Sequence, residues 1–383
     1  MISPALMEFD MRIALLLTLI ATNLAGWAAD APSWPIFRGD ARLSGLAEGS
    51  LPNQMALLWS FKTGDAIKSS PVIGNGLVYI GSSDGKVYAL NLTNGTVQWK
   101  FNTDDSVEAP PLLWNGTVYV GVVKGLLFAL DARDGKVKWQ YETAGKIMGS
   151  ANCVPAPDGN GQWILIGSYD NTMHCVDATS GKRVWTYETQ NFINGAPAVA
   201  AGKLVFGGCD AQIHVVSVAD GKSLAKIDAG SYIAASAALD GHLAFVGNYG
   251  GKLLCVDLVS QKTVWSYGNK ETETPFFASP AIGVDRIIAG CRDNSVHCVS
   301  RKDGQRIWVF KTRGDVDSSP VICGDKVVAC SVDGRIYLLK LSDGTQVWSY
   351  ELGAPIIGSP AVAGGWLIVG ADDGRVYAFG PKK

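Results

Sequence analysis

The sequence predicts an all-β protein built from eight copies of one supersecondary unit, and three observations carry that prediction. Glycine supplies 45 of the 383 residues, which indicates frequent turns. Tryptophans recur at intervals close to 40 residues. Between them, short runs alternate apolar and polar residues with the period of a strand. Four short strands in a repeat of about 40 residues are typical of one blade of a β-propeller.

The tryptophan spacing fixes the number of units. The steps between successive anchors are 40, 40, 46, 80, 43 and 40 residues, and the anchors are Trp59, Trp99, Trp139, Trp185, Trp265, Trp308 and Trp348. The step of 80 spans two periods, because the turn at Asp220-Gly221-Lys222 is kept and Ala225 stands where a tryptophan is expected. We therefore expect an eight-bladed propeller.

The first complete unit illustrates the four strands of a blade. Residues 69–73, 77–83, 86–92 and 96–102 each read as a short strand, and Asn-Gly and Asp-Gly turns separate them. Such turn pairs favour tight hairpins, so each blade is expected to be a four-stranded antiparallel sheet.

The two ends of the repeat array predict how the ring closes. A lone tryptophan strand covers residues 56–62, and the last unit stops after residues 375–380 without a tryptophan strand of its own. We expect the N-terminal strand to complete the eighth blade, which removes two unpaired sheet edges. The propeller would then span residues 55–383, and residues 29–54 would be an arm that caps the ring through Trp34 and Phe37.

Residues 1–28 have the composition of a secretory signal. Arg12 precedes an apolar run at 13–20, and small residues at Gly26 and Ala28 mark a cleavage point; Met1 and Met11 are both possible starts. The apolar run is too short to cross a bilayer comfortably, so no transmembrane segment is expected after cleavage. The segment has no cysteine for a lipid anchor. These features predict an exported protein, periplasmic or secreted.

The charge pattern excludes one class of partner. Lysine and arginine number 33 against 35 aspartate and glutamate residues, and no basic run occurs. Nucleic acid is therefore not an expected partner.

An eleven-residue motif connects the repeat to a known family. Ala129, Asp131, Gly135 and Trp139 fit the pattern Ala-x-Asp-x-x-Thr-Gly-x-x-x-Trp. This motif resembles the tryptophan-docking motif of the PQQ-like (quinoprotein-type) β-propeller repeat, over residues 56–380. The resemblance implies that each tryptophan stacks across a blade interface, wedged against a small residue and the backbone of a neighbouring unit, with the alanine leaving room for it.

The resemblance also implies what an enzyme of this family would need. PQQ-dependent dehydrogenases carry long insertions, calcium-binding acids and asparagines over the axis and, in alcohol dehydrogenases, adjacent cysteines. Here no Cys-Cys pair occurs and the longest repeat exceeds the shortest by only six residues. We therefore expect no catalytic residue and no cofactor; PQQ with Ca²⁺ belongs to the alternative of a quinoprotein dehydrogenase.

Cysteine and histidine residues are explained by position in the repeat. Cys175, Cys255 and Cys298 fill the alanine position of the motif, and three histidines fill the position of Tyr88 and Phe128: His174, His214 and His297. Both sets are expected to pack blades, so no metal site is predicted. Cys291 and Cys298 are the only disulfide candidates, and we expect them to be reduced.

The loops between the fourth strand of one blade and the first strand of the next remain as candidate binding surfaces, because loops on a rigid frame often carry binding sites. They contain Asp104, Asp105, Lys146, Phe192, Tyr232, Glu271, Glu273, Arg313, Asp315 and Asp317. We expect a non-catalytic scaffold for a protein partner, similar in architecture to the outer-membrane assembly lipoprotein BamB. Binding of a glycan or small molecule in the axial mouth is a further alternative.

Overall fold

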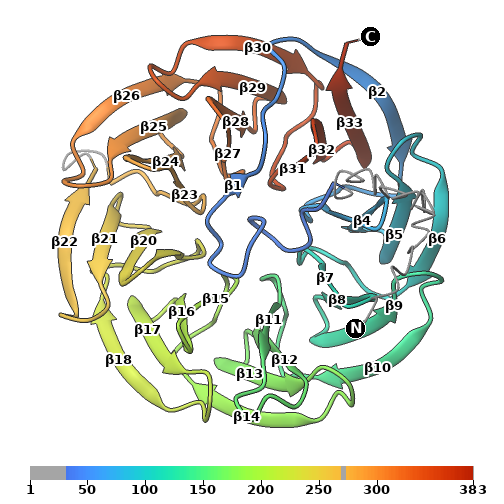
Figure 1. The fold of residues 1–383 in the computed structure, drawn as a ribbon, viewed down its shortest axis with the longest axis vertical. Coiled ribbons are helices and arrows are strands. Elements are labelled where there is room, and N and C mark those ends of the chain that lie inside the picture. Colours follow the sequence, from blue (N-terminus) through green and yellow to red (C-terminus); the bar gives the residue numbers. More distant parts are fainter. Residues whose placement is uncertain (1–31, 269–272, 383) are drawn as a thin grey trace, which may run out of the picture. The chain divides into compact units, whose positions relative to one another are not determined.

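The computed structural model describes residues 32–268 and 273–382. Within these residues the regular elements are all β-strands, and they form eight sheets arranged as a ring (Figure 1). The predicted eight-bladed β-propeller is confirmed. In each blade the first strand lies next to the central axis and the fourth lies at the rim.

The first four blades each contain four consecutive strands. Blade 1 has β3 (Val72–Gly74), β4 (Leu77–Ser82), β5 (Lys86–Asn91) and β6 (Val97–Asn102); blade 2 has β7 (Leu112–Trp114), β8 (Thr117–Gly121), β9 (Leu126–Asp131) and β10 (Val137–Glu142). Blade 3 has β11 (Asn152–Pro155), β12 (Gln162–Gly167), β13 (Thr172–Asp177) and β14 (Arg183–Glu188); blade 4 has β15 (Ala198–Ala200), β16 (Lys203–Gly207), β17 (Gln212–Ser217) and β18 (Ser223–Asp228).

The last four blades continue the pattern and close the ring. Blade 5 has β19 (Ala238–Asp240), β20 (Leu243–Gly247), β21 (Leu253–Asp257) and β22 (Lys262–Tyr267); blade 6 has β23 (Ala281–Ile282), β24 (Arg286–Cys291), β25 (Ser295–Ser300) and β26 (Arg306–Lys311). Blade 7 has β27 (Val321–Cys323), β28 (Lys326–Cys330), β29 (Arg335–Lys340) and β30 (Gln346–Glu351); blade 8 has β31 (Ala361–Ala363), β32 (Trp366–Gly370), β33 (Arg375–Pro381) and, from the other end of the propeller, β2 (Met55–Lys62).

The pairing of β2 with β33 confirms the predicted closure. The two strands are antiparallel, with Trp59 opposite Ala378 and Lys62 opposite Arg375. Every blade therefore has a fourth, outermost strand.

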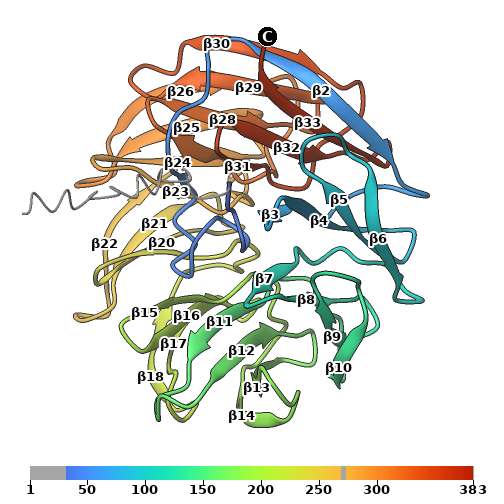
Figure 2. The same cartoon turned by 45° about the vertical axis from the view of Figure 1, so that its right-hand side comes forward.

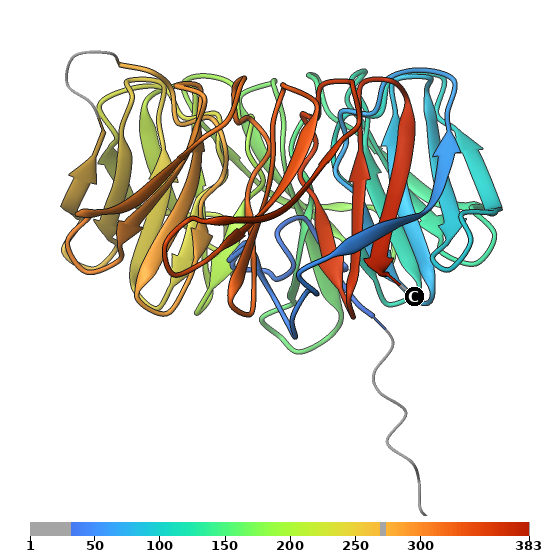
Figure 3. The same ribbon diagram turned by 90° about the horizontal axis from the view of Figure 1, so that it is seen from above.

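The up-and-down order of the strands sorts the connections onto two faces of the ring. Turns between second and third strands share one face with the loops that lead from a fourth strand to the next blade, and the remaining turns lie on the opposite face (Figure 3). We call the first the upper face and the second the lower face.

Small residues let the innermost strands approach one another around the axis. Blades 4 to 8 and blade 1 are linked by five hydrogen bonds of 2.8–3.0 Å, in which a backbone N–H donates to a serine Oγ of the next blade. The acceptors are Ser236, Ser279, Ser319, Ser359 and Ser70. These bonds satisfy buried amide groups where no strand pairing is available.

The tryptophans lock adjacent blades together. The indole N–H of Trp99 donates to the carbonyl oxygen of Ala132 in the next blade, and five other tryptophans make the equivalent bond at 2.8–3.0 Å. A methyl group on the turn residue Gly135 would lie 2.7 Å from the Trp99 ring. The neighbouring blade thus receives the indole through its turn glycine, whereas Ala129 lies opposite Trp139 within one blade. The expected small residue of the neighbouring unit is therefore the glycine and not the alanine.

Among the described residues, two of the eight seams lack this bond. At the seam between blades 7 and 8, Trp348 packs against the Phe379 ring instead. The seam between blades 4 and 5 has no tryptophan. Ala225 takes the tryptophan position in blade 4, and the turn of blade 5 that would receive an indole has Gln261, with φ of 58°, in place of glycine. A cavity of about 270 Å³ lies at this seam, and Val205, Leu239 and Leu258 contribute to its lining. The interface between blades 4 and 5 is thus formed without an indole.

The N-terminal arm, residues 32–54, crosses the axis of the ring (Figure 2) and lies toward the lower face (Figure 3). Its backbone is hydrogen-bonded to the innermost strands of blades 1, 2, 4, 5, 6 and 7, and its strand β1 (Leu46–Ala47) pairs in parallel with β27. Trp34 is buried and forms an antiparallel bridge with Ile73.

Arg38 anchors the middle of the arm. Its guanidinium is buried and donates to the carbonyl oxygens of Ser319 and Pro280, both at 3.1 Å. Burial lowers its pKa to about 9, partly opposed by Asp40, so the side chain stays charged at neutral pH. The arm is therefore tied to blades 6 and 7 through a buried cation.

Candidate functional site

The predicted site residues lie on the upper face, but they do not form a single cluster. The described ones are distributed over six loops around the ring: Asp104 and Asp105 before blade 2, Lys146 before blade 3, Phe192 before blade 4, Tyr232 before blade 5, Glu273 before blade 6, and Arg313, Asp315 and Asp317 before blade 7. Glu271, which was also predicted, lies outside the described residues. A binding site on this face must therefore be located by comparing the side chains of the different sectors of the ring.

The axial mouth on this face is a small polar cavity of about 150 Å³. The arm contributes Phe37 to its lining, and every loop contributes to it; the residues include Lys68, Glu108, Met148, Asn194, Ala234, Phe277, Asp317 and Ile357. Lys68 and Glu108 form an ion pair of 3.3 Å across two loops. The mouth is thus narrow and its charges are partly matched.

Aromatic side chains gather on the loops and turns of blades 3 to 6. We call this group the aromatic arc. It consists of five aromatic residues and the arginine that packs on one of them: Tyr169, Phe192, Tyr232, Tyr249, Phe277 and Arg292. Its backbone is held by the repeat, because the N–H of Tyr249 donates to the carbonyl of Tyr232 at 2.8 Å and the N–H of Cys209 donates to that of Phe192 at 2.9 Å.

The part of the arc on blade 3 is a preformed stack. The rings of Tyr169 and Phe192 are parallel within 4° and their centroids lie 4.8 Å apart. The Tyr169 hydroxyl donates to Asn194 Oδ1 at 2.5 Å, and burial raises the pKa of this phenol. Phe192 is nevertheless 44% exposed and Tyr232 is 58% exposed, so large apolar surfaces face solvent on a rigid support.

Arg292 completes the arc on blade 6. Its guanidinium lies 4.3 Å from the ring centroid of Phe277, and it forms a bidentate pair with Asp317 at 2.8 and 2.9 Å. Hydrogen bonding to Asp317 raises the pKa of Arg292. The structure thus joins the predicted residue Asp317 to two residues that the sequence analysis did not select.

The opposite sector of the upper face is polar. Here Asp372 lies near the Lys68–Glu108 pair, and burial raises the pKa of its carboxyl group. Asp104 and Asp105 belong to this sector, and Lys124 Nζ donates to the carbonyl of Asp104 at 3.0 Å. The upper face therefore has an aromatic side and a charged side.

Tyr169, Tyr249 and Arg292 were missed because the analysis of the loops left out the turns between second and third strands. A signal was present. These residues share one position of the repeat, one or two residues after the second strand, where the other blades have Ser83, Val123, Cys209, Val332 and Asp372. Antiparallel pairing places those turns on the same face as the loops.

The three histidines lie at blade interfaces. Each is hydrogen-bonded through Nδ1 to a tyrosine of the preceding blade and through Nε2 to an aspartate of its own blade: Tyr141–His174–Asp170, Tyr187–His214–Asp210 and Tyr267–His297–Asp293. Burial lowers the pKa of His174 and His214. All eight cysteines are free thiols, Cys291 and Cys298 included.

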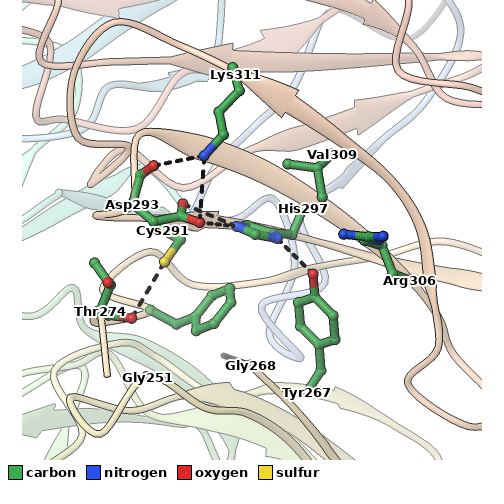
Figure 4. A pocket seen from close by; sticks show the side chains of 11 residues that line it. Gly251, Tyr267, Gly268, Thr274, Cys291, Asp293, His297, Arg306, Val309 and Lys311 are labelled. Carbon is green, nitrogen blue, oxygen red and sulfur yellow. Dashed lines mark hydrogen bonds and ion pairs between the residues drawn. The ribbon is translucent and has the colours of Figure 1, made fainter. Parts of the chain in front are cut away.

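Among the described residues, one group of three has ligand atoms close enough to hold a metal ion. It consists of Cys291, Asp293 and His297, beside a cavity between blades 5 and 6 (Figure 4).

No helix within residues 32–268 and 273–382 has the length and apolarity required to cross a membrane.

The fold and its docking motif define the class: this is a PQQ-like repeat propeller. The family model described as outer membrane protein assembly factor BamB matches residues 51–160, 154–278, 210–330 and 292–383, and the chain belongs to this family. No curated protein matches the chain significantly.

Solved structures with the same fold include a BamB and two dehydrogenases. BamB from Moraxella catarrhalis is 19% identical, with a TM-score of 0.72 over 86% of this chain and 100% of its own. A europium-containing methanol dehydrogenase is 14% identical, with a TM-score of 0.75 over 91% and 98%. Quinohemoprotein alcohol dehydrogenase from Comamonas testosteroni is 14% identical, with a TM-score of 0.75 over 93% and 82%. At these identities the likeness establishes the fold alone.

Proposed function

We propose that this protein is a non-catalytic propeller of the bacterial cell envelope that binds a protein partner through the aromatic arc, in the assembly of outer-membrane proteins. The observation that carries the proposal is the arc itself. Tyrosine, phenylalanine and arginine are enriched in the energetically dominant centres of protein interfaces, and here they are rigidly held and partly exposed.

The sector of the ring also supports a protein partner. The arc spans blades 3 to 6 and is therefore an extended surface and not a pocket. A rigid curved surface of this kind suits another folded or extended chain. The family, described as an outer membrane protein assembly factor, supports the pathway, and the composition of residues 1–28 supports export.

The alternative of a PQQ-dependent dehydrogenase fits the residues of the axial mouth poorly. Its volume of about 150 Å³ is below the roughly 300–1,000 Å³ usual for ligand sites, and Phe37 of the arm occupies its floor. The acids of the mouth, Glu108 and Asp317, are each paired with a cation. The same small volume disfavours a glycan within the axis.

Site-specific photocrosslinking in the envelope tests the proposal. A photoreactive amino acid is placed at 192 or 232 in the arc and, as a control, at 66 or 106, which hold the same repeat position in other loops. We expect the arc positions to yield one predominant crosslinked protein of the assembly machinery, and the control positions to yield little of it. Equal yields at all four positions would contradict the proposal.

Matched substitutions provide the second arm of the test. Phe192→Ala and Tyr232→Ser introduce residues that the chain itself carries at this position, Ala66 and Ser106. The variants should fold normally and reduce capture of that partner at least about tenfold, as expected for losing an interface anchor. Dye reduction after addition of PQQ and Ca²⁺ would instead support the dehydrogenase.

A further inference from the structure

Cys291, Asp293 and His297 converge at the upper end of blade 6. Cys291 is the last residue of β24, His297 lies in β25, and Asp293 belongs to the tight turn between the two strands. The thiol, a carboxylate oxygen and a ring nitrogen all lie within 4.8 Å of one another. Both Asp293 oxygens are 3.1 Å from His297 Nε2.

The sister blades show which part of this cluster belongs to the general architecture. Blades 3 and 4 have the same tyrosine–histidine–aspartate set without a thiol, because Ser168 and Gly208 take the position of Cys291. The histidine and aspartate alone therefore pack blades. A sulfur ligand beside them is particular to blade 6.

Blade 6 also differs in access. A cavity of about 580 Å³ opens beside the cluster, and its lining includes Tyr267, Phe276, Arg306 and Lys311 (Figure 4). The Asp293 side chain is 30% exposed, compared with 11% for Asp170 and 4% for Asp210. An ion could thus reach this carboxylate from solvent.

We propose that Cys291, Asp293 and His297 bind a divalent transition-metal ion of the Zn²⁺ class at the interface of blades 5 and 6. Thiolate, imidazole and carboxylate together are ligands that Zn²⁺ accepts and that Mg²⁺ and Ca²⁺ do not favour. Metal–ligand bonds of about 2.0–2.3 Å place the ligand atoms roughly 3.3–3.7 Å from one another. Small side-chain rotations that move these atoms by about 1 Å would bring the sulfur, the carboxylate oxygen and the ring nitrogen onto one ion.

The surroundings of the cluster suit this role. The Tyr267 hydroxyl is hydrogen-bonded to His297 Nδ1 at 2.9 Å, which leaves Nε2 as the atom directed at Asp293 and Cys291. Lys311 Nζ lies 4.0 Å from the Asp293 carboxylate, but its side chain is 70% exposed and can turn away. Three protein ligands leave a fourth position toward the cavity, where Arg306 and Lys311 favour an anionic ligand such as chloride.

The net charge of the loaded site is compatible with the nearby Arg306 and Lys311. A thiolate and a carboxylate neutralise a divalent ion when the imidazole is neutral. The loaded site would therefore carry no net charge to repel Arg306 or Lys311.

Titration of the full-length protein with Co²⁺ tests the site, because cobalt bound to a thiolate produces an intense near-ultraviolet charge-transfer band. We expect one equivalent of Co²⁺ to generate this band and Zn²⁺ to abolish it by displacement. Cys291→Ser should remove the band and weaken Zn²⁺ binding at least about 100-fold, more than the loss of a supporting contact would. Serine is already present at this position in other blades, as Ser82, Ser168 and Ser331, so folding should be retained.

Two further variants separate this site from the other thiols and from folding. Cys153→Ser and Cys209→Ser change the two partly exposed cysteines and should keep the band. The double variant H297Y/Y267F copies the Tyr88–Phe61 pair of blades 1 and 8 and should lose it while the ring stays folded. A protein without the band, or a band that survives Cys291→Ser, would overturn the proposal.

Discussion

The indole N–H of Trp99 donates a 2.9 Å hydrogen bond to the carbonyl oxygen of Ala132, and this bond ties the rim of blade 1 to the turn of blade 2. The ring is only 7% exposed and packs on the face of that turn. A single side chain thus supplies both apolar packing and a polar contact to the next blade.

Removing the Trp99 side chain should lower the stability of the fold without affecting partner binding at the aromatic arc. We expect Trp99→Ala to lower the free energy of unfolding by about 3–5 kcal/mol, because a large buried side chain is lost. Trp114, which is 42% exposed, provides a matched control whose replacement by alanine should change it by less than about 0.5 kcal/mol. Urea unfolding followed by circular dichroism measures both, and equal losses would refute the role of Trp99.

The unlocked seam between blades 4 and 5 should be repairable only by two changes together. At six other seams a methyl group on the turn glycine would lie 2.5–2.7 Å from the docked indole, so the Gln261 side chain obstructs a tryptophan at position 225. We expect Ala225→Trp alone to give no stabilisation. The double variant A225W/Q261G should show a favourable coupling of about 1 kcal/mol or more in a double-mutant cycle. Additive effects would contradict this explanation.

Strand β2 should be necessary for a monomeric ring. Replacing residues 55–62 by a glycine–serine linker of equal length leaves β33 with an unpaired edge while the arm stays attached. Such an edge pairs with other chains, so we expect oligomers or insoluble protein. Analytical ultracentrifugation measures the outcome; a linker variant that is monomeric and as stable as the parent would show that closure is dispensable.

The buried histidines should make stability depend on pH. Burial lowers the pKa of His174 and His214 below the ordinary value of about 6.5, so the unfolded chain takes up protons more readily than the folded one. Their contribution to the free energy of unfolding is complete above about pH 6.5 and is lost as the pH falls below it.

A matched variant isolates this effect. H174Y/Y141F copies the Tyr88–Phe61 pair, in which the tyrosine hydroxyl donates directly to the turn aspartate Asp84 at 2.6 Å. We expect the free energy of unfolding to fall less between pH 7 and pH 5 in this variant than in the parent, as measured by urea unfolding at each pH. An unchanged slope would show that His174 does not contribute.

The eight blades and their closure could be predicted because every blade repeats the same local signals. Register follows from the Asp-Gly turns and the tryptophan, and even Ala225 kept its place through the turn at Gly221. Local signals do not extend to the arm. The partners of Arg38 are backbone carbonyls of residues 280 and 319, and nothing in the surrounding sequence marks them.

The candidate site was predicted only in outline for a similar reason. Phe192 and Tyr232 were found because they lie in the loops between blades. Their neighbours Tyr169 and Tyr249 lie in turns that come close only through the three-dimensional ring. The thiol of Cys291 was likewise considered against Cys298, whereas its neighbours in space are Asp293 and His297.

The closure of blade 8 has a consequence for the order of folding. Thr63 and Gly374, at the junction of β2 and β33, are hydrogen-bonded although 311 residues separate them. A ribosome makes β2 before every other blade strand and β33 after them, so the first strand of the propeller must wait for the synthesis of all eight blades. Closure of the ring is therefore the last strand pairing that synthesis permits, and until it forms both edges of the future seam are open to other chains.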